Sequence, residues 1–381
     1  MTEHIAIVGG GTGGTVLANR LTDELRREID DGDVAVTLID ENEQQTYKPV
    51  FLYVAFGERT VEDARRPITD LVDARRVDVR HERVTGVDTD EKRLRFSGGG
   101  GLTYDYLVMA TGATLDPGSV PGLVEGGHHF YGPDGAETLR DELAAFESGH
   151  LVLSVIGVPH MCPAAPLEFV LMADDWFRER GLREDVEITY TYPIQRAHAI
   201  ESIADWASEE FAERDINLET FCNPDEVDPD ENVLRTVEGT EIDYDLLVGI
   251  PPHSGDPLVA ESGLGEDGWI PVDRHTLEAE TAEDVYAIGD AADVPTSKAG
   301  SVAHYEAGAV ADRLAARVRG QVPTATYDGK TICFVESGMD EATFVEFGYG
   351  DEPVVREPSR ALHWSKLAYN EAYWLTARGL V

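Results

Sequence analysis

The sequence predicts an α/β fold with two Rossmann-like strand–turn–helix units. Apolar residues typical of a buried strand lead into glycines at residues 4–9 and again at 151–157, and a segment of helical composition follows each turn. The chain has 381 residues, which is enough for two domains and an additional C-terminal segment. We therefore expect two α/β domains and a tail.

The first unit is complete. Its strand leads into Gly9, Gly11 and Gly14, which fit the spacing G-x-G-x-x-G. Residues 16–27 have helical composition, and the next apolar strand ends in Asp40. Such a turn places backbone N–H groups and a helix N-terminus against a pyrophosphate, and the acid holds ribose hydroxyls. The unit predicts dinucleotide binding; the alternative is a glycine turn without a ligand.

Two later segments indicate which dinucleotide binds. Ala110, Thr111 and Gly112 follow a buried strand, and Gly289 and Asp290 stand between another strand and a helix. Both segments resemble the signature segments of the two-dinucleotide flavoproteins. In that family the first site holds FAD, so the resemblance implies FAD here.

The same resemblance implies how the domains are arranged. The expected FAD domain is discontinuous and comprises residues 1–115 and 265–320. A second Rossmann-like domain, residues 116–264, is nested inside it, and a cap follows at 321–381.

The second unit lacks its phosphate turn. After the strand 151–156, Gly157 is followed by Pro159 and Cys162 where the second and third glycines should stand. Proline has no backbone donor and cysteine adds bulk, so a nicotinamide cofactor is disfavoured. We place Cys162 at the start of a helix with Pro163 as its first residue, where the dipole favours a thiolate. The alternative is a small buried cysteine.

Five segments carry a more specific resemblance. They are "YKPVFLYVAFG" (47–57), "MCPAAPLE" (161–168), "DVPTSKAG" (293–300), "TICFVESG" (331–338) and "HWSKLAYNEAYW" (363–374). Together they resemble sulfide:quinone oxidoreductase and the related flavoprotein subunit of flavocytochrome c sulfide dehydrogenase. In both, two distant cysteines form a redox-active disulfide beside the flavin, which implies Cys162 and Cys333 here. Cys222 matches no motif of the family and is interpreted as structural.

The resemblance, the first glycine turn and the position of Glu168 after Cys162 together predict a set of site residues. The expected catalytic residues are Cys162, Cys333, Glu168 and Lys298, although Glu168 could equally be an acid that a helix start favours. The residues expected to bind FAD are Gly9, Gly11, Thr12, Gly13, Gly14, Asp40, Glu41, Lys48, Pro49, Val84, Ala110, Thr111, Gly112, Gly289, Asp290 and Lys298. His198 is expected at the surface or as a cap, and no metal site is expected. Where many members have a third cysteine, this chain has "GGHHFYG", which argues against covalent FAD through a thiol.

The tail has two interpretations. Residues 355–381 are more basic than the rest, and residues 361–375 concentrate tryptophan and tyrosine. Such a helix suits a membrane interface, or it packs on the flavin domain and covers the ring. No signal peptide is visible, and prolines interrupt the longest apolar run, 151–173. We expect a cytoplasmic protein with peripheral membrane attachment, and a possible homo-oligomer.

The predicted function is FAD-dependent oxidation of sulfide to sulfane sulfur or polysulfide, with electrons passed to a membrane quinone. Three alternatives stay open. They are a type II NADH:quinone dehydrogenase, a flavocytochrome c-type enzyme with a haem partner, and a non-catalytic flavin-binding module. A nucleic-acid partner is not expected, because the net charge is −42.

This charge generates a prediction about salt. The chain has 73 acidic and 31 basic residues, which indicates a protein of a salty cytoplasm. We expect the melting temperature to rise between roughly 0.1 M and 2 M KCl, because the screening length falls from about 10 Å to a few Å. A melting temperature that is flat or falls across this series would refute the halophilic interpretation.

Overall fold

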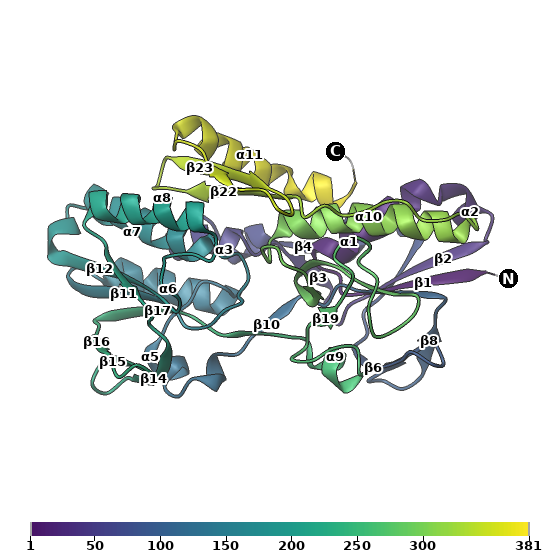
Figure 1. Ribbon diagram of the computed structural model, residues 1–381, viewed down its shortest axis with the longest axis horizontal. Helices are drawn as coiled ribbons and strands as arrows, with labels where there is room; N and C mark the ends of the chain where they lie inside the picture. The colour runs from purple at the N-terminus through teal and green to yellow at the C-terminus, as the bar shows by residue number, and fades with distance from the viewer. Residues whose placement is uncertain (1, 380–381) are drawn as a thin grey trace.

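The computed structural model describes residues 2–379, in which two parallel sheets lie side by side and a C-terminal layer extends across both (Figure 1). The first residue of the expected FAD domain, Met1, and the last two of the expected cap, Leu380 and Val381, lie outside the described residues. No helix within residues 2–379 is both long and apolar enough to cross a membrane.

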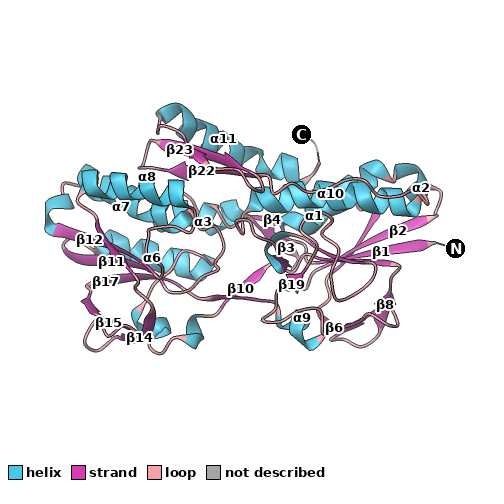
Figure 2. Cartoon of the chain, viewed as in Figure 1, coloured by secondary structure: helices cyan, strands magenta, loops and turns pink. Residues whose placement is uncertain are grey.

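The first sheet carries the complete glycine turn. Its strand order is β20-β9-β1-β2-β5, and all neighbouring strands are parallel. In that order the strands are Val285–Ala287, Tyr106–Met109, Glu3–Val8, Val34–Ile39 and Val77–Arg80. Most of their side chains are buried, as expected for a parallel sheet that is covered on both faces. Helices α1 (Thr12–Glu24) and α10 (Gly300–Val318) pack together over one face (Figure 2).

The second sheet has the order β13-β12-β11-β17 and is also parallel. Its strands are Asn217–Thr220, Val186–Tyr192, Gly149–Val155 and Leu246–Ile250. Helices α6 (Pro133–Ala145), α7 (Ala165–Glu179) and α8 (Glu201–Arg214) belong to this domain. The chain leaves the first domain through β10 (Ala113–Leu115) and returns through β18 (His253–Gly255), and these two strands pair antiparallel. The predicted fold class, two nested Rossmann-like domains, is confirmed.

Short elements complete both domains. Each has a small antiparallel sheet, β6-β7-β8 in the first and β14-β15-β16 in the second. Their strands are Val84–Asp88, Arg93–Phe96 and Gly101–Thr103, then Pro224–Asp228, Val233–Thr236 and Glu241–Asp243. The other short elements are α2 (Arg26–Asp30), β3 (Gln44–Thr46), α3 (Val50–Ala55), β4 (Arg65–Pro67), α4 (Ile68–Leu71), α5 (Leu123–Gly126), α9 (Pro257–Glu261), β19 (Ile270–Pro271) and β21 (Ala292–Asp293).

The C-terminal layer is a hairpin followed by a long helix. Strands β22 (Thr331–Glu336) and β23 (Ala342–Phe347) pair antiparallel, and β24 (Val354–Val355) joins them. Helix α11 (Arg360–Ala377) begins after Ser359, whose side chain caps the Leu362 N–H. Asn19 of α1 donates to the Ala377 carbonyl at 2.7 Å, so the end of α11 is fastened to the first domain.

The hairpin is also fastened to the second domain. Asp174 of α7 is fully buried and forms ion pairs with Arg178, Arg183 and Arg214. Arg214 also donates to the Ser337 carbonyl at 2.8 Å, in the turn between β22 and β23. The C-terminal layer therefore bridges the two domains through directional contacts at both ends.

Candidate active site

The first glycine turn has the geometry of a phosphate cradle. Gly9 has φ +109°, and a Cβ there would meet the Ala110 carbonyl oxygen at 2.2 Å. A Cβ on Gly14 would meet the Gly9 carbonyl oxygen at 1.9 Å, whereas one on Gly11 would meet nothing within 4 Å. Helix α1 starts directly after Gly11, so its N-terminal N–H groups face this open space. Two glycines allow close packing and the third leaves room for a ligand.

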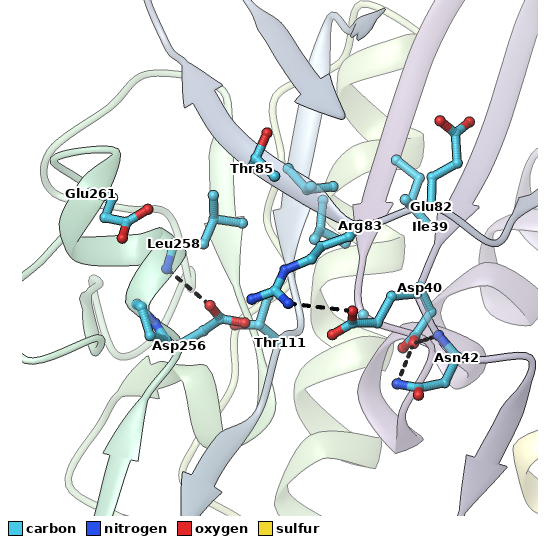
Figure 3. Close-up of a pocket in the computed structure, with 15 residues that line it drawn as sticks. Ile39, Asp40, Asn42, Glu82, Arg83, Thr85, Thr111, Asp256, Leu258 and Glu261 are labelled. Carbon is cyan, nitrogen blue, oxygen red and sulfur yellow. Dashed lines mark hydrogen bonds and ion pairs between the residues drawn. The ribbon is translucent and has the colours of Figure 1, made fainter. Parts of the chain in front are cut away.

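A long cleft extends from this turn. A pocket of about 230 Å³ lies between the first sheet and α9, and Glu41, Arg83, Val84 and Asp256 line it (Figure 3). It shares Gly9, Asp40, Asn42 and Thr111 with a cavity of about 750 Å³ that reaches the second domain and α11. Every residue expected to bind FAD lines one or both, except Gly14, which packs beneath Gly9.

The polar groups of this cleft fit FAD. Asp40 follows β2, and its carboxylate accepts the Gly10 N–H at 2.6 Å. It also accepts the Asn42 N–H at 2.8 Å (Figure 3). The buried Thr111 hydroxyl has no partner among the described residues, and no side chain caps α1. Unpaired donors beside an open glycine turn suit a pyrophosphate, and the larger cavity beyond them offers space for a ring system.

The two expected redox cysteines line the larger cavity from different elements. Cys162 has φ +45°, its N–H donates to the Lys298 carbonyl at 2.8 Å, and its carbonyl accepts the Tyr131 hydroxyl at 3.2 Å. Cys333 lies within β22 opposite Val345. Both thiols are free in this structure, and so is that of Cys222, which is buried elsewhere.

The predicted environment of Cys162 is wrong in two respects. Helix α7 begins at Ala165 with Ala164 as its N-cap, so Cys162 and Pro163 precede the helix. Burial raises the pKa of Cys162, and the nearby Glu168 carboxylate raises it further. Burial likewise raises the pKa of Cys333 to about 12. Both cysteines are therefore protonated as thiols in this state, rather than favoured as thiolates.

Glu168 belongs to a buried charge cluster that the sequence did not reveal. It contacts the Lys366 ammonium and accepts the Glu336 N–H at 2.7 Å. The Lys366 nitrogen also lies 3.9 Å from the Glu336 carboxylate. Tyr53 donates to Glu336 at 2.6 Å, and the His363 ring lies 3.0 Å from it. Burial raises the pKa of Glu168, while the Lys366 ammonium opposes this shift, so the carboxyl takes up a proton more readily than an exposed glutamate would.

Helix α11 forms one wall of the larger cavity. The Tyr373 ring stacks on Tyr47 with 3.8 Å between centroids, and its hydroxyl lies 2.7 Å from the Thr12 hydroxyl. Lys366, Tyr369, Asn370 and Tyr373 all line the cavity. Of the two interpretations of the tail, packing on the flavin domain agrees with these contacts. The spacing of these four residues by three or four positions is the helical signal that could have identified them.

Lys298 supports the turn after β20. Its ammonium donates to the Asp290 carbonyl at 2.7 Å and lies 3.9 Å above the Trp269 ring. The Lys298 carbonyl also accepts the Cys162 N–H. Lys298 therefore connects the turn after β20 to the loop that contains Cys162.

Residues 3–311 match the pyridine nucleotide-disulphide oxidoreductase family. The chain belongs to this family. It is 26% identical to the mitochondrial sulfide:quinone oxidoreductase of Mus musculus over 93% of this chain and 80% of that protein. It is 24% identical to the sulfide-quinone reductase of Aquifex aeolicus over 98% of this chain and 91% of that protein. The crystal structure of the sulfide:quinone oxidoreductase from A. aeolicus superposes with a TM-score of 0.87 at 22% identity, over 99% of this chain and 92% of that chain.

These findings confirm the resemblance and FAD as the cofactor. The second strand–turn–helix unit of this chain differs from its first. Its helix begins well beyond Gly157, and Pro193 follows β12 where Asp40 follows β2. The missing acid was a further sequence signal against a nicotinamide site. His198 is buried rather than at the surface, and its ring accepts the Ile200 N–H at 3.0 Å.

A buried acid that contacts the turn after β20 generates a prediction about pH. Glu306 of α10 is fully buried, and its carboxylate accepts the Gly289 N–H at 2.5 Å. Burial raises its pKa from 4.5 to about 8, with Asp290 adding to the effect. Between these two pH values the native state retains a proton on Glu306 that the unfolded chain loses. The contribution of this proton to the free energy of unfolding is therefore complete below pH 4.5 and disappears as the pH rises to about 8.

We therefore expect the free energy of unfolding of the wild type to fall relative to Glu306→Gln as the pH rises through this window. The slope should approach about 1.4 kcal/mol per pH unit. Chemical denaturation at fixed FAD and salt measures it, with the same substitution at the exposed Glu213 as control. Identical pH profiles for wild type and Glu306→Gln would show that this carboxyl is not buried as a neutral acid.

Proposed function

We propose that this chain is a sulfide:quinone oxidoreductase. The observation that carries the proposal is the shared cavity. Cys162 and Cys333, which are far apart in sequence, line the same cavity as the intact glycine turn. The names of the relatives at 24–26% identity agree with this activity. A type II NADH:quinone dehydrogenase is less well supported, because the second nucleotide turn is missing.

The cysteines would act as one disulfide in the oxidised enzyme. Hydrosulfide attacks one of the two sulfurs, so that a new sulfur–sulfur bond forms and the Cys162–Cys333 bond breaks. The products are a persulfide on one cysteine and a thiolate on the other. Glu168 would take or return the proton of the persulfide or of the freed thiol; this role is supported by its location in the same cavity as both cysteines and by the pKa that burial raises. When bound, FAD would supply the acceptor for the two electrons left on the thiolate, and quinone would be their final acceptor.

The quinone would approach along α11. Trp364 and Leu375 of this helix are 68% and 46% exposed, while Lys366 and Tyr369 line the cavity on its inner side. Exposed apolar side chains on one face of a helix suit contact with a membrane surface. This arrangement supports peripheral membrane attachment. Lys366 does not contribute to such contact, because it is buried against Glu168.

The decisive experiment compares two electron donors under anaerobic conditions. We expect sulfide to bleach the flavin absorbance of the wild type stoichiometrically, and NADH at the same concentration to leave it unchanged. Cys333→Ser should lose the reaction with sulfide and keep its FAD, because the glycine turn is untouched. Cys222→Ser is the matched control, because its thiol lies in a separate core, and it should react like the wild type.

Two results would refute the proposal. Rapid bleaching by micromolar NADH would favour the dehydrogenase, and full sulfide reactivity in Cys333→Ser would exclude the cysteine pair. A flavin that responds to neither donor would indicate a non-catalytic flavin-binding module.

A further inference from the structure

Lysine is rare in this chain, and three of its five lysines, Lys48, Lys298 and Lys366, line the large cavity. Four of the five have strong partners. Lys92 pairs with Asp284, Lys330 with Glu346, Lys366 with Glu168, and Lys298 donates to the Asp290 carbonyl. Lys48 is the exception, because within residues 2–379 its ammonium has one acceptor, the Met161 sulfur at 2.9 Å.

The position of Lys48 makes this exception significant. It follows Tyr47, lines the cavity, and is an exposed residue. An ammonium has three N–H donors, and a thioether is a weak acceptor. Lys48 therefore presents a positive charge, with one weak protein acceptor, in the cavity that Met161 and Cys162 also line.

The nature of the ligand follows from charge and size. The chain as a whole carries −42, so its surface repels anions, and an anionic substrate needs a local positive charge to be held. A single ammonium acts as a point charge and lacks the planar fork by which arginine binds a carboxylate in two places. Such a point charge can hold a small monovalent anion. The neighbouring residue on the loop, Cys162, is where such a sulfur anion would react.

We propose that Lys48 is the binding residue for hydrosulfide, which it holds beside Met161 for reaction at the cysteine pair. The inference rests on the proposed function for its substrate. The binding site itself rests on the Lys48 ammonium, whose one acceptor within residues 2–379 is the Met161 sulfur. Lys48 was expected from the sequence to contact FAD, and its charge could instead stabilise the reduced flavin. An experiment can distinguish the binding of a hydrosulfide anion from the stabilisation of the negatively charged reduced flavin.

The test uses thiocyanate, a small sulfur-containing anion that does not reduce flavin, as the probe. Oxidised holoprotein is titrated at constant ionic strength, and the shift in flavin absorbance gives the dissociation constant. We expect Lys48→Met to weaken thiocyanate binding about tenfold or more, as expected for the loss of a charge-assisted hydrogen bond. Lys48→Arg should retain most of the affinity. Lys330→Met removes the same charge from a surface ion pair and should bind thiocyanate like the wild type.

Sulfide provides the second arm. The sulfide concentration for half-maximal flavin reduction should rise in Lys48→Met by a similar factor, while the flavin midpoint potential stays unchanged. Arg65 is the one arginine that lines the cavity, and Arg65→Met tests whether any cavity cation serves equally. FAD content and melting temperature verify that each variant is folded.

Each outcome is decisive. Unchanged thiocyanate affinity in Lys48→Met, or an equal loss in Arg65→Met, would overturn the site. A shifted midpoint potential with unchanged thiocyanate affinity would show that the charge serves the reduced flavin, and would overturn the hydrosulfide assignment. If thiocyanate binding depends on Lys48 but sulfide does not reduce the flavin of the wild type, the anion site is supported and the proposed function is refuted.

Discussion

The position of Lys366 between two buried carboxylates determines how the active site is assembled. Glu168, Glu336 and Lys366 come from α7, β22 and α11, and all three are almost fully removed from solvent. A buried charge that loses its partner costs about 3–5 kcal/mol, so these three elements must dock together. Glu168 lies in the first turn of α7, just after Cys162, and Glu336 ends the strand that contains Cys333. The cluster therefore brings both cysteine segments to one cavity.

Sequence reasoning succeeded where the signal is local and failed where it depends on tertiary contacts. The glycine turn and Asp40 are predictable because their spacing alone determines the strand–turn–helix geometry. The start of α7 was misplaced because Pro163 and Pro166 both suit a helix start, and the structure uses Pro166. Lys366 looked like a basic residue of a surface helix, since its partner Glu168 is 198 positions away. No local pattern reports such a contact.

Charge distribution connects the stability of the protein with its proposed chemistry. Acidic residues dominate the surface, where salt screens their repulsion, while the few lysines concentrate at the cavity. Two of the cavity lysines hold protein groups in place, and Lys48 remains available to an anion. In the proposed function the missing second nucleotide turn has a complementary role, because it disfavours a nicotinamide as a competing hydride donor. Both features agree with a small sulfur anion as the proposed substrate.

The central claim is that Cys162 and Cys333 act as one redox pair, and peptide mapping of the oxidised holoprotein tests it most directly. After alkylation under denaturing conditions and digestion, mass spectrometry should find the Cys162 and Cys333 peptides linked by a disulfide or by a chain with additional sulfur. Cys222 should be alkylated in full. Reduction before alkylation should release the linked peptides. Complete alkylation of Cys162 and Cys333 in the oxidised protein would contradict the account.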